Sequence, residues 1–289
     1  NLVELTCVPF MIWGVWLIVR EAKLIHFLWA GLLLGMAVSF RYQVGVFALG
    51  IAAVLFFQWK FKAFTLFCLG VLVVFGLTQG VVDYMIWGYP FAEFIGYSTY
   101  NMNEGTAYVP NNNYFMYILI LMGAFLVPLG FLLGVGFLKS WKKYAIIFVP
   151  TLCFILFHSF YPSKQERFIM PVLAFFLILG VMGYESLKVK ESWRKFWNIS
   201  LKIFWVINIP LLLLASFTYS KRSRVEAMTY FNEKSIVPDR MLLEGTGESG
   251  IPMLPYFYGG FWRRGDVPRT TADQSLLVYD NYVYDYILF

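Results

Sequence analysis

Long apolar runs separated by short polar segments dominate the chain up to about residue 219. A membrane-spanning helix needs about 20 predominantly apolar residues, and about 17 at its shortest. The pattern predicts eight spans, of which the third is short, over residues 3–19, 24–40, 44–59, 63–80, 114–138, 144–160, 168–184 and 199–219. The predicted fold class is therefore an all-α polytopic membrane protein, with a transmembrane helical bundle over residues 1–219.

The pattern changes in residues 220–289, where charges become more frequent and glycines and prolines interrupt short apolar runs. Leu242–Leu243, Leu276–Tyr279 and Tyr282–Ile287 have the apolar, β-branched and aromatic composition of short strands. We predict a small extramembrane α+β domain here.

The composition supports the membrane assignment, because only 14% of the residues are charged and 60% are hydrophobic. Soluble domains contain about 25% charged residues. The net charge of +6 comes from basic residues scattered through short loops, which does not indicate nucleic-acid binding. The three cysteines lie in apolar runs without metal-type spacing, so neither a metal nor a cofactor is expected. The chain begins at Asn1 rather than Met, and we expect it to be a piece of a longer protein.

Basic residues concentrate in every second loop of the predicted bundle. By the positive-inside rule, the loops rich in Lys and Arg are cytoplasmic. Those loops contain Arg20, Lys23, Lys60, Lys62, Lys139, Lys142, Lys143, Lys188, Lys190, Arg194 and Lys195. The opposite ends of the spans carry Glu4, Arg41, Asp83, Glu93, His158, Lys164, Glu166 and Arg167. This second set favours a shared cavity facing the ER lumen or the periplasm, although a solvated outer surface would give the same pattern.

The stretch His158–Pro171 holds a dense polar cluster between two predicted spans. Ser163 and Glu166 have the spacing of a capping box, which places Lys164 and Arg167 on the first turn of a helix. A helix N-terminus carries partial positive charge, so two cations there are unfavourable unless an anion joins them. Phosphate is the natural anion for such a position. The alternative is that both side chains simply extend to lipid headgroups.

The segment 80–113 is the longest predicted loop between spans, and it contains acids and many aromatics but no Lys or Arg. Aromatic faces combined with Asn and Asp suit sugar binding, since pyranose rings stack on aromatics and hydroxyls need polar partners. An aromatic belt with a short amphipathic interfacial helix would have the same composition.

Three stretches together resemble a known enzyme family. The order His158…Lys164-Gln-Glu166-Arg167-Phe168…Pro171 is similar to the H-K-E-x-R-F-x-x-P signature of the dolichyl-phosphate-mannose-dependent mannosyltransferases. These are enzymes of N-glycan and GPI-anchor assembly with bacterial relatives, in glycosyltransferase family 22 of the GT-C superfamily. Asn1-Leu-Val-Glu4 resembles the end of a second family motif, and the segment from Asp83 to Asn103 resembles the family's outer loop. The chain departs from the signature in separating His158 from Lys164 and in placing Gln165 before Glu166.

The resemblance implies a GT-C-like bundle that transfers a hexose, mannose by analogy, from a polyprenyl-phosphate or dolichyl-phosphate donor to a lipid-linked or other membrane glycan, with inversion. The implied donor-phosphate ligands are Lys164, Arg167 and Arg41. Glu166, His158 and Glu4 are the implied supporting residues, with Glu166 pairing with Arg167. Asp83, Asn101 and Asn103 are implied to orient sugar hydroxyls. The catalytic base is expected outside this chain, so no catalytic residue is assigned.

Two other functions remain open at this stage. A transporter or flippase would show charges near mid-membrane, broken helices and internal pseudo-symmetry; the predicted spans are nearly free of charge and no repeat is visible. A structural subunit would tolerate alanine at Lys164 and Arg167. The expected location is the bacterial inner membrane or the ER membrane. Short loops and a compact tail favour a bacterial relative.

Overall fold

The computed structural model describes residues 3–20, 23–103, 113–162, 164–186, 191–218, 222–235, 241–245, 269–271 and 286–288. The chain separates into two compact units, Asn1–Val206 and Ile207–Phe289. The division falls within a long helix, whereas the sequence predicts a domain boundary near residue 219. That predicted boundary stays a prediction.

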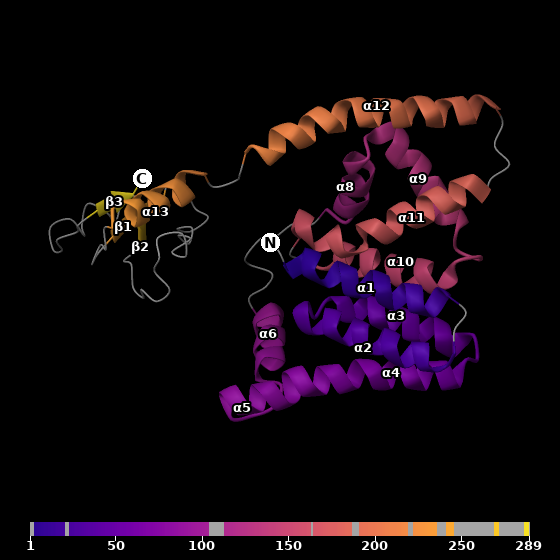
Figure 1. Ribbon diagram of the computed structural model, residues 1–289, viewed down its shortest axis with the longest axis horizontal. Helices are drawn as coiled ribbons and strands as arrows, with labels where there is room; N and C mark the ends of the chain where they lie inside the picture. Colours follow the sequence, from indigo (N-terminus) through magenta and orange to yellow (C-terminus); the bar gives the residue numbers. More distant parts are fainter. Residues whose placement is uncertain are drawn as a thin grey trace. The chain divides into compact units, whose positions relative to one another are not determined.

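The first unit is a bundle of apolar helices (Figure 1). Backbone polar groups in a bilayer must be satisfied within the chain, and helix formation does this for each apolar run. This unit's described helices are α1 (Val3–Val19), α2 (Ile25–Phe40), α3 (Val44–Phe57), α4 (Phe61–Phe75), the π-helix η1 (Gly76–Val82), α5 (Asp83–Trp87), α6 (Ala92–Asn103), α8 (Met116–Ala124), α9 (Val127–Lys139), α10 (Ala145–Phe160), the 3₁₀-helix η2 (Glu166–Ile169), α11 (Met170–Ser186) and the part of α12 (Glu191–Ser216) up to Val206.

Helices that could cross a membrane fall into three groups in the described part of the chain. The continuous helices Phe61–Trp87, Glu166–Ser186 and Glu191–Ser216 are long and apolar enough to span it. The bent pair α8 and α9 would add one more span. The remaining apolar helices, α1, α2, α3 and α10, are shorter, at 14 to 17 residues. The expected count of eight spans therefore remains a prediction.

Close helix packing in the bundle depends on glycines at the contact lines. Gly31 of α2 faces the carbonyl of Phe67 in α4, and Gly136 of α9 faces the carbonyl of Gly180 in α11. Apolar surface drives helix association weakly in lipid, so small residues that let backbones approach are favoured instead. Phe47 and Phe175 fill the centre of the core, with ring centroids 4.9 Å apart.

We expect Gly183→Ala to destabilise the protein by about 1–3 kcal/mol, because the added methyl overpacks the contact between α11 and α9. The new Cβ would overlap the Gly136 carbonyl oxygen and lie 2.5 Å from Ser140 Oγ. Gly123→Ala is the matched control, since nothing lies within 4 Å of its added Cβ. Thermal unfolding of the purified protein in detergent measures both. An equal melting temperature for Gly183→Ala and the parent would contradict this packing.

The predicted span 114–138 is not one straight helix. It is broken into α8 and α9, which are bent by 115° and form an inverted V in Figure 1. Leu126 at the break has a φ of 59°, and Pro128 follows it inside the first turn of α9. Proline lacks an N–H and disfavours helical geometry in the residue before it, so the run cannot continue straight.

The prediction of a loop over residues 80–113 is also wrong in its first part. Helix α4 continues through η1 into α5 and ends at Gly88, whose φ of 80° is left-handed. Helix α6 then covers Ala92–Asn103. Residues 104–112 lie outside the described part. The apolar and aromatic residues after Gly80 continue the helix. The polar residues among them were the reason for predicting a loop.

The second unit contains helix α13 (Arg222–Glu233) and three short strands among its described residues. The strands β1 (Met241–Gly245), β2 (Arg269–Thr271) and β3 (Tyr286–Leu288) form a parallel sheet in the order β2-β1-β3. In register, Leu243 faces both Arg269 and Leu288. The predicted strand 242–243 falls within β1 and 282–287 overlaps β3, whereas 276–279 lies outside the described residues.

Candidate functional site

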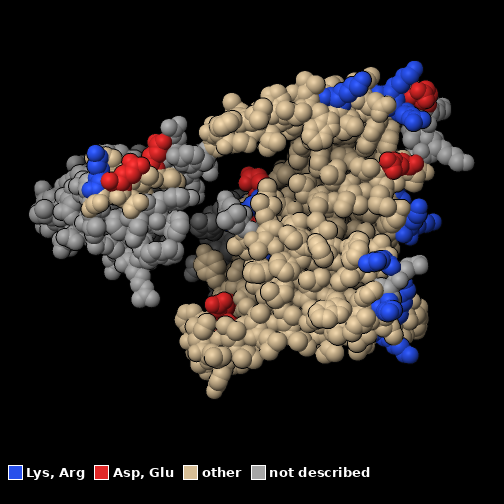
Figure 2. All heavy atoms as spheres, viewed as in Figure 1, with Lys and Arg blue, Asp and Glu red and all other residues tan. Residues whose placement is uncertain are grey.

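Charged side chains mark two opposite edges of the helical unit. Lys and Arg gather along one edge, on the right in Figure 2. The helices run between this edge and the opposite one, where α1 begins and α2 and α10 end (Figure 1). The sequence-predicted site residues Glu4, Arg41 and Arg167 belong to that second edge.

A buried carboxylate joins two arginines at the centre of the candidate site. Glu4 Oε1 lies 3.4 Å from Arg41 Nη2 and 3.6 Å from Arg167 Nε. The Glu4 side chain is 3% exposed, whereas those of Arg41 and Arg167 are 19% and 39% exposed. Three separate elements supply these residues: the first turn of α1, the end of α2 and η2. One anion is therefore shared between two cations.

The aromatic ring of Phe168 lies beside both guanidinium groups. The ring centroid is 4.8 Å from Arg41 Cζ and 5.6 Å from Arg167 Cζ. Guanidinium groups over aromatic faces are attracted by the ring quadrupole, more strongly where water is excluded. Phe168 thus orients the two arginines. The carboxylate that the structure shows beside Arg167 is that of Glu4, while Glu166, the partner expected from the resemblance, is exposed.

Arg41 is placed by the end of helix α2. It is the C-cap residue, with an extended backbone, and its N–H donates to the Ala37 carbonyl at 3.0 Å. The end of a helix carries partial negative charge, which favours a cation at this position. The end of α2 therefore places Arg41 at the edge of the bundle where α1 begins.

The segment before η2 is held by a buried tyrosine that the sequence analysis missed. The Tyr117 hydroxyl donates to the Gln165 carbonyl at 3.2 Å and lies 3.3 Å from the Gln165 nitrogen, whose N–H it accepts. Lys164 is buried, with its Nζ 5.4 Å from the centroid of the Tyr114 ring. Because these two hydrogen bonds hold the Gln165 backbone, they also restrict the position of the neighbouring Lys164.

The described helix begins later than the expected capping box would place it. Gln165 is the N-cap of η2, with extended backbone angles and no side-chain cap, and Ser163 lies outside the described residues. Arg167 lies in the first turn, as expected, but Lys164 precedes it. The first turn is 3₁₀-helical, which a pattern of residue types does not distinguish from an α-helical one.

Burial lowers the pKa of Lys164 from its ordinary value of 10.5. The amine therefore loses its charge at a lower pH than an exposed lysine does. If Lys164 binds a donor phosphate, we expect KM for the donor to rise as the pH approaches this lowered pKa. Lys164→Arg should move that rise to higher pH, because a guanidinium stays charged above about pH 12. A pH profile of transfer kinetics measures this, and identical alkaline limbs for both proteins would contradict it.

His158 lies beside the cluster but makes no ion pair in the described structure. It is buried near the end of α10, and its Nδ1 is 2.9 Å from the Phe154 carbonyl, which can only accept. Nδ1 therefore carries the proton, and Nε2 has no hydrogen-bond partner among the described residues. The imidazole packs 6.3 Å from the Phe168 ring and 6.2 Å from the Tyr117 ring, between centroids. It meets the site through aromatic contacts.

The sequence-predicted sugar residue Asp83 caps the next helix. It is buried in α5, and its Oδ2 accepts the Glu93 backbone N–H at 3.0 Å, near the start of α6. Tyr42 donates to Gln79 Oε1 and packs its ring 5.1 Å from that of Tyr97, between centroids. Burial, with the negative charges of Glu93 and Asp83, raises the pKa of Tyr42 to about 12. Because Tyr42 follows Arg41, these contacts hold α6 next to the arginines.

The other end of α6 contacts the segment that leads to Lys164. Tyr161 donates to Asn101 Oδ1 at 3.2 Å, and Asn101 Nδ2 donates to the Tyr97 carbonyl at 2.7 Å. Burial raises the pKa of Tyr161. The side chain of Asn103 lies outside the described residues. Helix α6 is therefore attached along its length to elements that carry the cations.

Sequence reasoning named the charged residues but missed the tyrosines that position them. Tyr42, Tyr117 and Tyr161 each hydrogen-bond a residue distant in the chain. Their signal was the occurrence of tyrosine at the end of an apolar run, which an interfacial aromatic belt also produces. Within the described part of the chain, no group of three or more His, Cys, Asp or Glu side chains could hold a metal ion.

Comparisons with known proteins agree with the resemblance seen in the sequence. The Alg9-like mannosyltransferase family matches residues 4–240. A Saccharomyces cerevisiae protein, Dol-P-Man:Man(7)GlcNAc(2)-PP-Dol alpha-1,6-mannosyltransferase, is 28% identical over 246 residues, which cover 75% of this chain and 41% of that protein. The chain thus spans less than half of this relative. No solved structure matches. The match over most of the sequence confirms the resemblance, and the chain belongs to the Alg9-like mannosyltransferase family.

Proposed function

We propose that the protein containing this chain transfers mannose from a dolichyl-phosphate or related polyprenyl-phosphate donor to a lipid-linked glycan. Family membership and the activity in the yeast relative's name support this proposal. Neither comparison supports a transporter or flippase. The expected course is inversion by a single displacement.

The observation that carries the proposal is the convergence of two arginines on Glu4 at one edge of the bundle. Arg41 and Arg167 share its one carboxylate, and Lys164 lies three residues before Arg167. Charged residues at the ends of membrane helices commonly mark substrate or ion sites. A polyprenyl phosphate is an anionic substrate that such cations can bind, and its charge grows as the sugar–oxygen bond breaks. Cations already in place stabilise this developing charge without reorganising.

Each residue then has a distinct role in this proposal. Arg167 and Lys164 bind the donor phosphate, Arg41 contributes a third cation, and Glu4 holds the two arginines. His158 and Glu166 are supporting residues. A carboxylate from outside this sequence takes the proton of the acceptor hydroxyl.

The proposed setting is the ER membrane, with eight spans and the site on the lumenal face. The gathering of Lys and Arg at the other edge supports this orientation. The yeast relative favours the ER over the bacterial inner membrane that the short loops suggested. Residues 220–289 are proposed to form an extramembrane α+β domain on the same face as the site.

Asp83, Asn101 and Asn103 remain proposed sugar ligands, and Asp83→Asn tests the first of them. Asparagine keeps an acceptor oxygen for the Glu93 N–H, so α6 should stay in place. We expect unchanged thermal stability with turnover reduced about tenfold, the loss of one charged hydrogen bond to a sugar hydroxyl. Turnover equal to that of the parent would show that Asp83 caps α6 but does not bind the sugar.

A transfer assay in membranes tests the proposed function itself. The full-length protein is supplied with radiolabelled polyprenyl-phosphate mannose, or with the glucose analogue, and a lipid-linked glycan acceptor. We expect labelled product from the mannose donor and its loss in Lys164→Ala, with Lys139→Ala as the control at the opposite edge. Equal product from the parent and Lys164→Ala would show that Lys164 is not needed for transfer. No product from either donor would overturn the proposal.

A further inference from the structure

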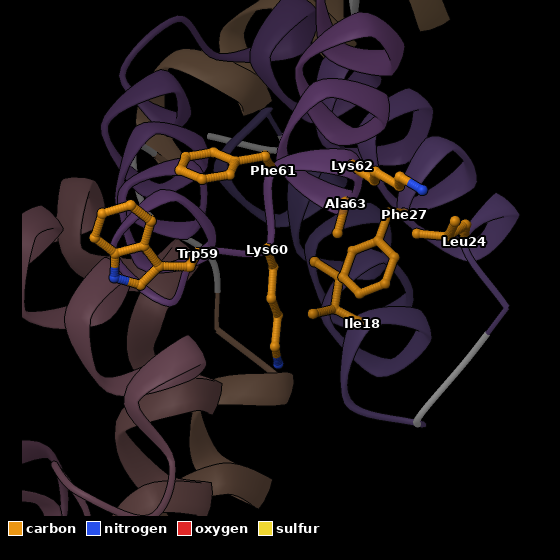
Figure 3. Close-up of a pocket in the computed structure, with 8 residues that line it drawn as sticks. All are labelled: Ile18, Leu24, Phe27, Trp59, Lys60, Phe61, Lys62 and Ala63. Atoms are coloured by element: carbon orange, nitrogen blue, oxygen red, sulfur yellow. The ribbon is translucent and has the colours of Figure 1, made fainter.

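A second polar feature lies at the opposite, basic edge of the helical unit, where four helix ends meet. A pocket of about 670 Å³ lies between the end of α1, the start of α2 and the turn from α3 to α4. Its walls are apolar, and two lysines stand among them (Figure 3). The lining includes Ile18, Leu24, Phe27, Phe61, Lys60 and Lys62. Nothing in the proposed transfer reaction uses these residues.

The pocket combines two kinds of surface that one ligand class matches. Ile18 is buried and Phe27 is half-buried, so they offer a fixed apolar wall. Lys60 extends between Trp59 on one side and Ile18 and Phe27 on the other, while Lys62 projects near Leu24 (Figure 3). An acyl chain fits the apolar wall, and a phosphate fits the amines. A ligand with both parts is a phospholipid.

The turn between α3 and α4 places a large aromatic residue in a strained backbone conformation. Trp59 has a φ of 58°, in the left-handed region where helix ends usually place glycine. The Lys60 N–H donates to the Leu55 carbonyl at 3.0 Å, which closes the turn that requires this conformation. The Trp59 side chain is nevertheless exposed. Its ring packs edge-on against that of Phe61, with centroids 5.6 Å apart, and the rest of the ring is open to a ligand at the pocket.

We propose that this pocket binds an acidic phospholipid of the membrane leaflet at the basic edge. Its phosphate contacts Lys60 beside Trp59, one acyl chain follows Ile18 and Phe27, and Lys62 adds positive charge on the far side of this apolar wall (Figure 3). Basic pockets between membrane helices on the cytoplasmic side are recognised lipid-headgroup sites. The first turn of α4, whose N-cap Lys60 has no side-chain cap, adds to the attraction for phosphate. This inference does not depend on the proposed mannosyl transfer.

The test measures lipid binding by the purified full-length protein in detergent. Thermal shifts are recorded during titration with phosphatidylserine, or with phosphatidylcholine of the same acyl chains. We expect stabilisation by the acidic lipid alone. In Lys60→Gln/Lys62→Gln the apparent affinity should fall at least about tenfold, since each basic residue near such a surface contributes about fivefold. The control Lys142→Gln/Lys143→Gln removes the same charge near the same edge but outside the pocket; its affinity should stay within about twofold of the parent.

Three results would overturn the proposal. Equal losses in the two double variants would assign the effect to general surface charge. Equal stabilisation by phosphatidylcholine would show that the lysines do not select acidic lipids. Equal stabilisation by inorganic phosphate at the same concentration would show that the acyl chain does not contribute to binding.

Trp59→Gly keeps the inference testable if the lysine variant folds poorly. Glycine relieves the left-handed strain, so the lipid-free melting temperature should not fall. The shift caused by phosphatidylserine should nevertheless shrink by more than half, because the aromatic ring beside the phosphate is lost. A full lipid response in Trp59→Gly would show that this pocket is not the binding site.

Discussion

Replacing Arg167 by alanine is expected to reduce mannosyl transfer by at least about 100-fold, the usual loss for one preorganised group that stabilises developing charge. Arg167 shares Glu4 with Arg41 and lies beside the Phe168 ring, so its guanidinium is already oriented when the donor arrives. Its side chain is 39% exposed, which leaves one side open to a ligand. The loss should appear mainly in kcat, because negative charge develops on the phosphate as the sugar departs.

Two comparisons make this result specific. Arg167→Lys keeps the charge but cannot form a two-point contact with phosphate, so its activity should be intermediate. Arg20→Ala removes an arginine at the other end of α1, where it lies 4.9 Å from the Trp16 ring, and should leave transfer unchanged. The measurement is steady-state transfer at matched protein levels in membranes. Equal kcat in Arg167→Ala and the parent would exclude Arg167 from the reaction.

Glu4→Gln is expected to destabilise the folded protein by about 2 kcal/mol and to impair transfer with it. Removing one partner of a buried ion pair costs about 3–5 kcal/mol, and the partly exposed arginines reduce this by allowing water to reach them. Without the carboxylate, two guanidinium groups remain beside one phenylalanine ring with no shared anion. Thermal unfolding in detergent measures the change in stability.

A double variant separates charge repulsion from a general packing defect. In Glu4→Gln/Arg41→Gln one of the two cations is removed with the anion, so much of the lost stability should return. Residues in one ion-pair network show such coupling, of about 0.5–3 kcal/mol. If the losses in Glu4→Gln and Arg41→Gln simply add, the shared carboxylate has no special role. A parent-like melting temperature for Glu4→Gln would have the same meaning.

The site shows where residue pattern alone reached its limit. Lys164 and Arg167 could be grouped because they are neighbours in the chain, and Glu4 and Arg41 because span ends alternate between two faces. That Glu4, rather than Glu166, lies between the arginines depends on how α1, α2 and η2 pack. Asp83 shows the same limit, because the donor to its carboxylate is a backbone N–H ten residues away across a turn.

Features that depend on local composition could be predicted from the residues alone: apolar helices typical of a membrane protein, basic residues concentrated in alternate loops, and a resemblance to a mannosyltransferase family. The break between α8 and α9, the two helices within residues 83–103, and the carboxylate shared by Arg41 and Arg167 became visible only in the folded chain. The two groups of features differ in the sequence distance over which they are set. Hydropathy is set by adjacent residues, whereas an ion pair or a close helix contact depends on residues that only packing brings together.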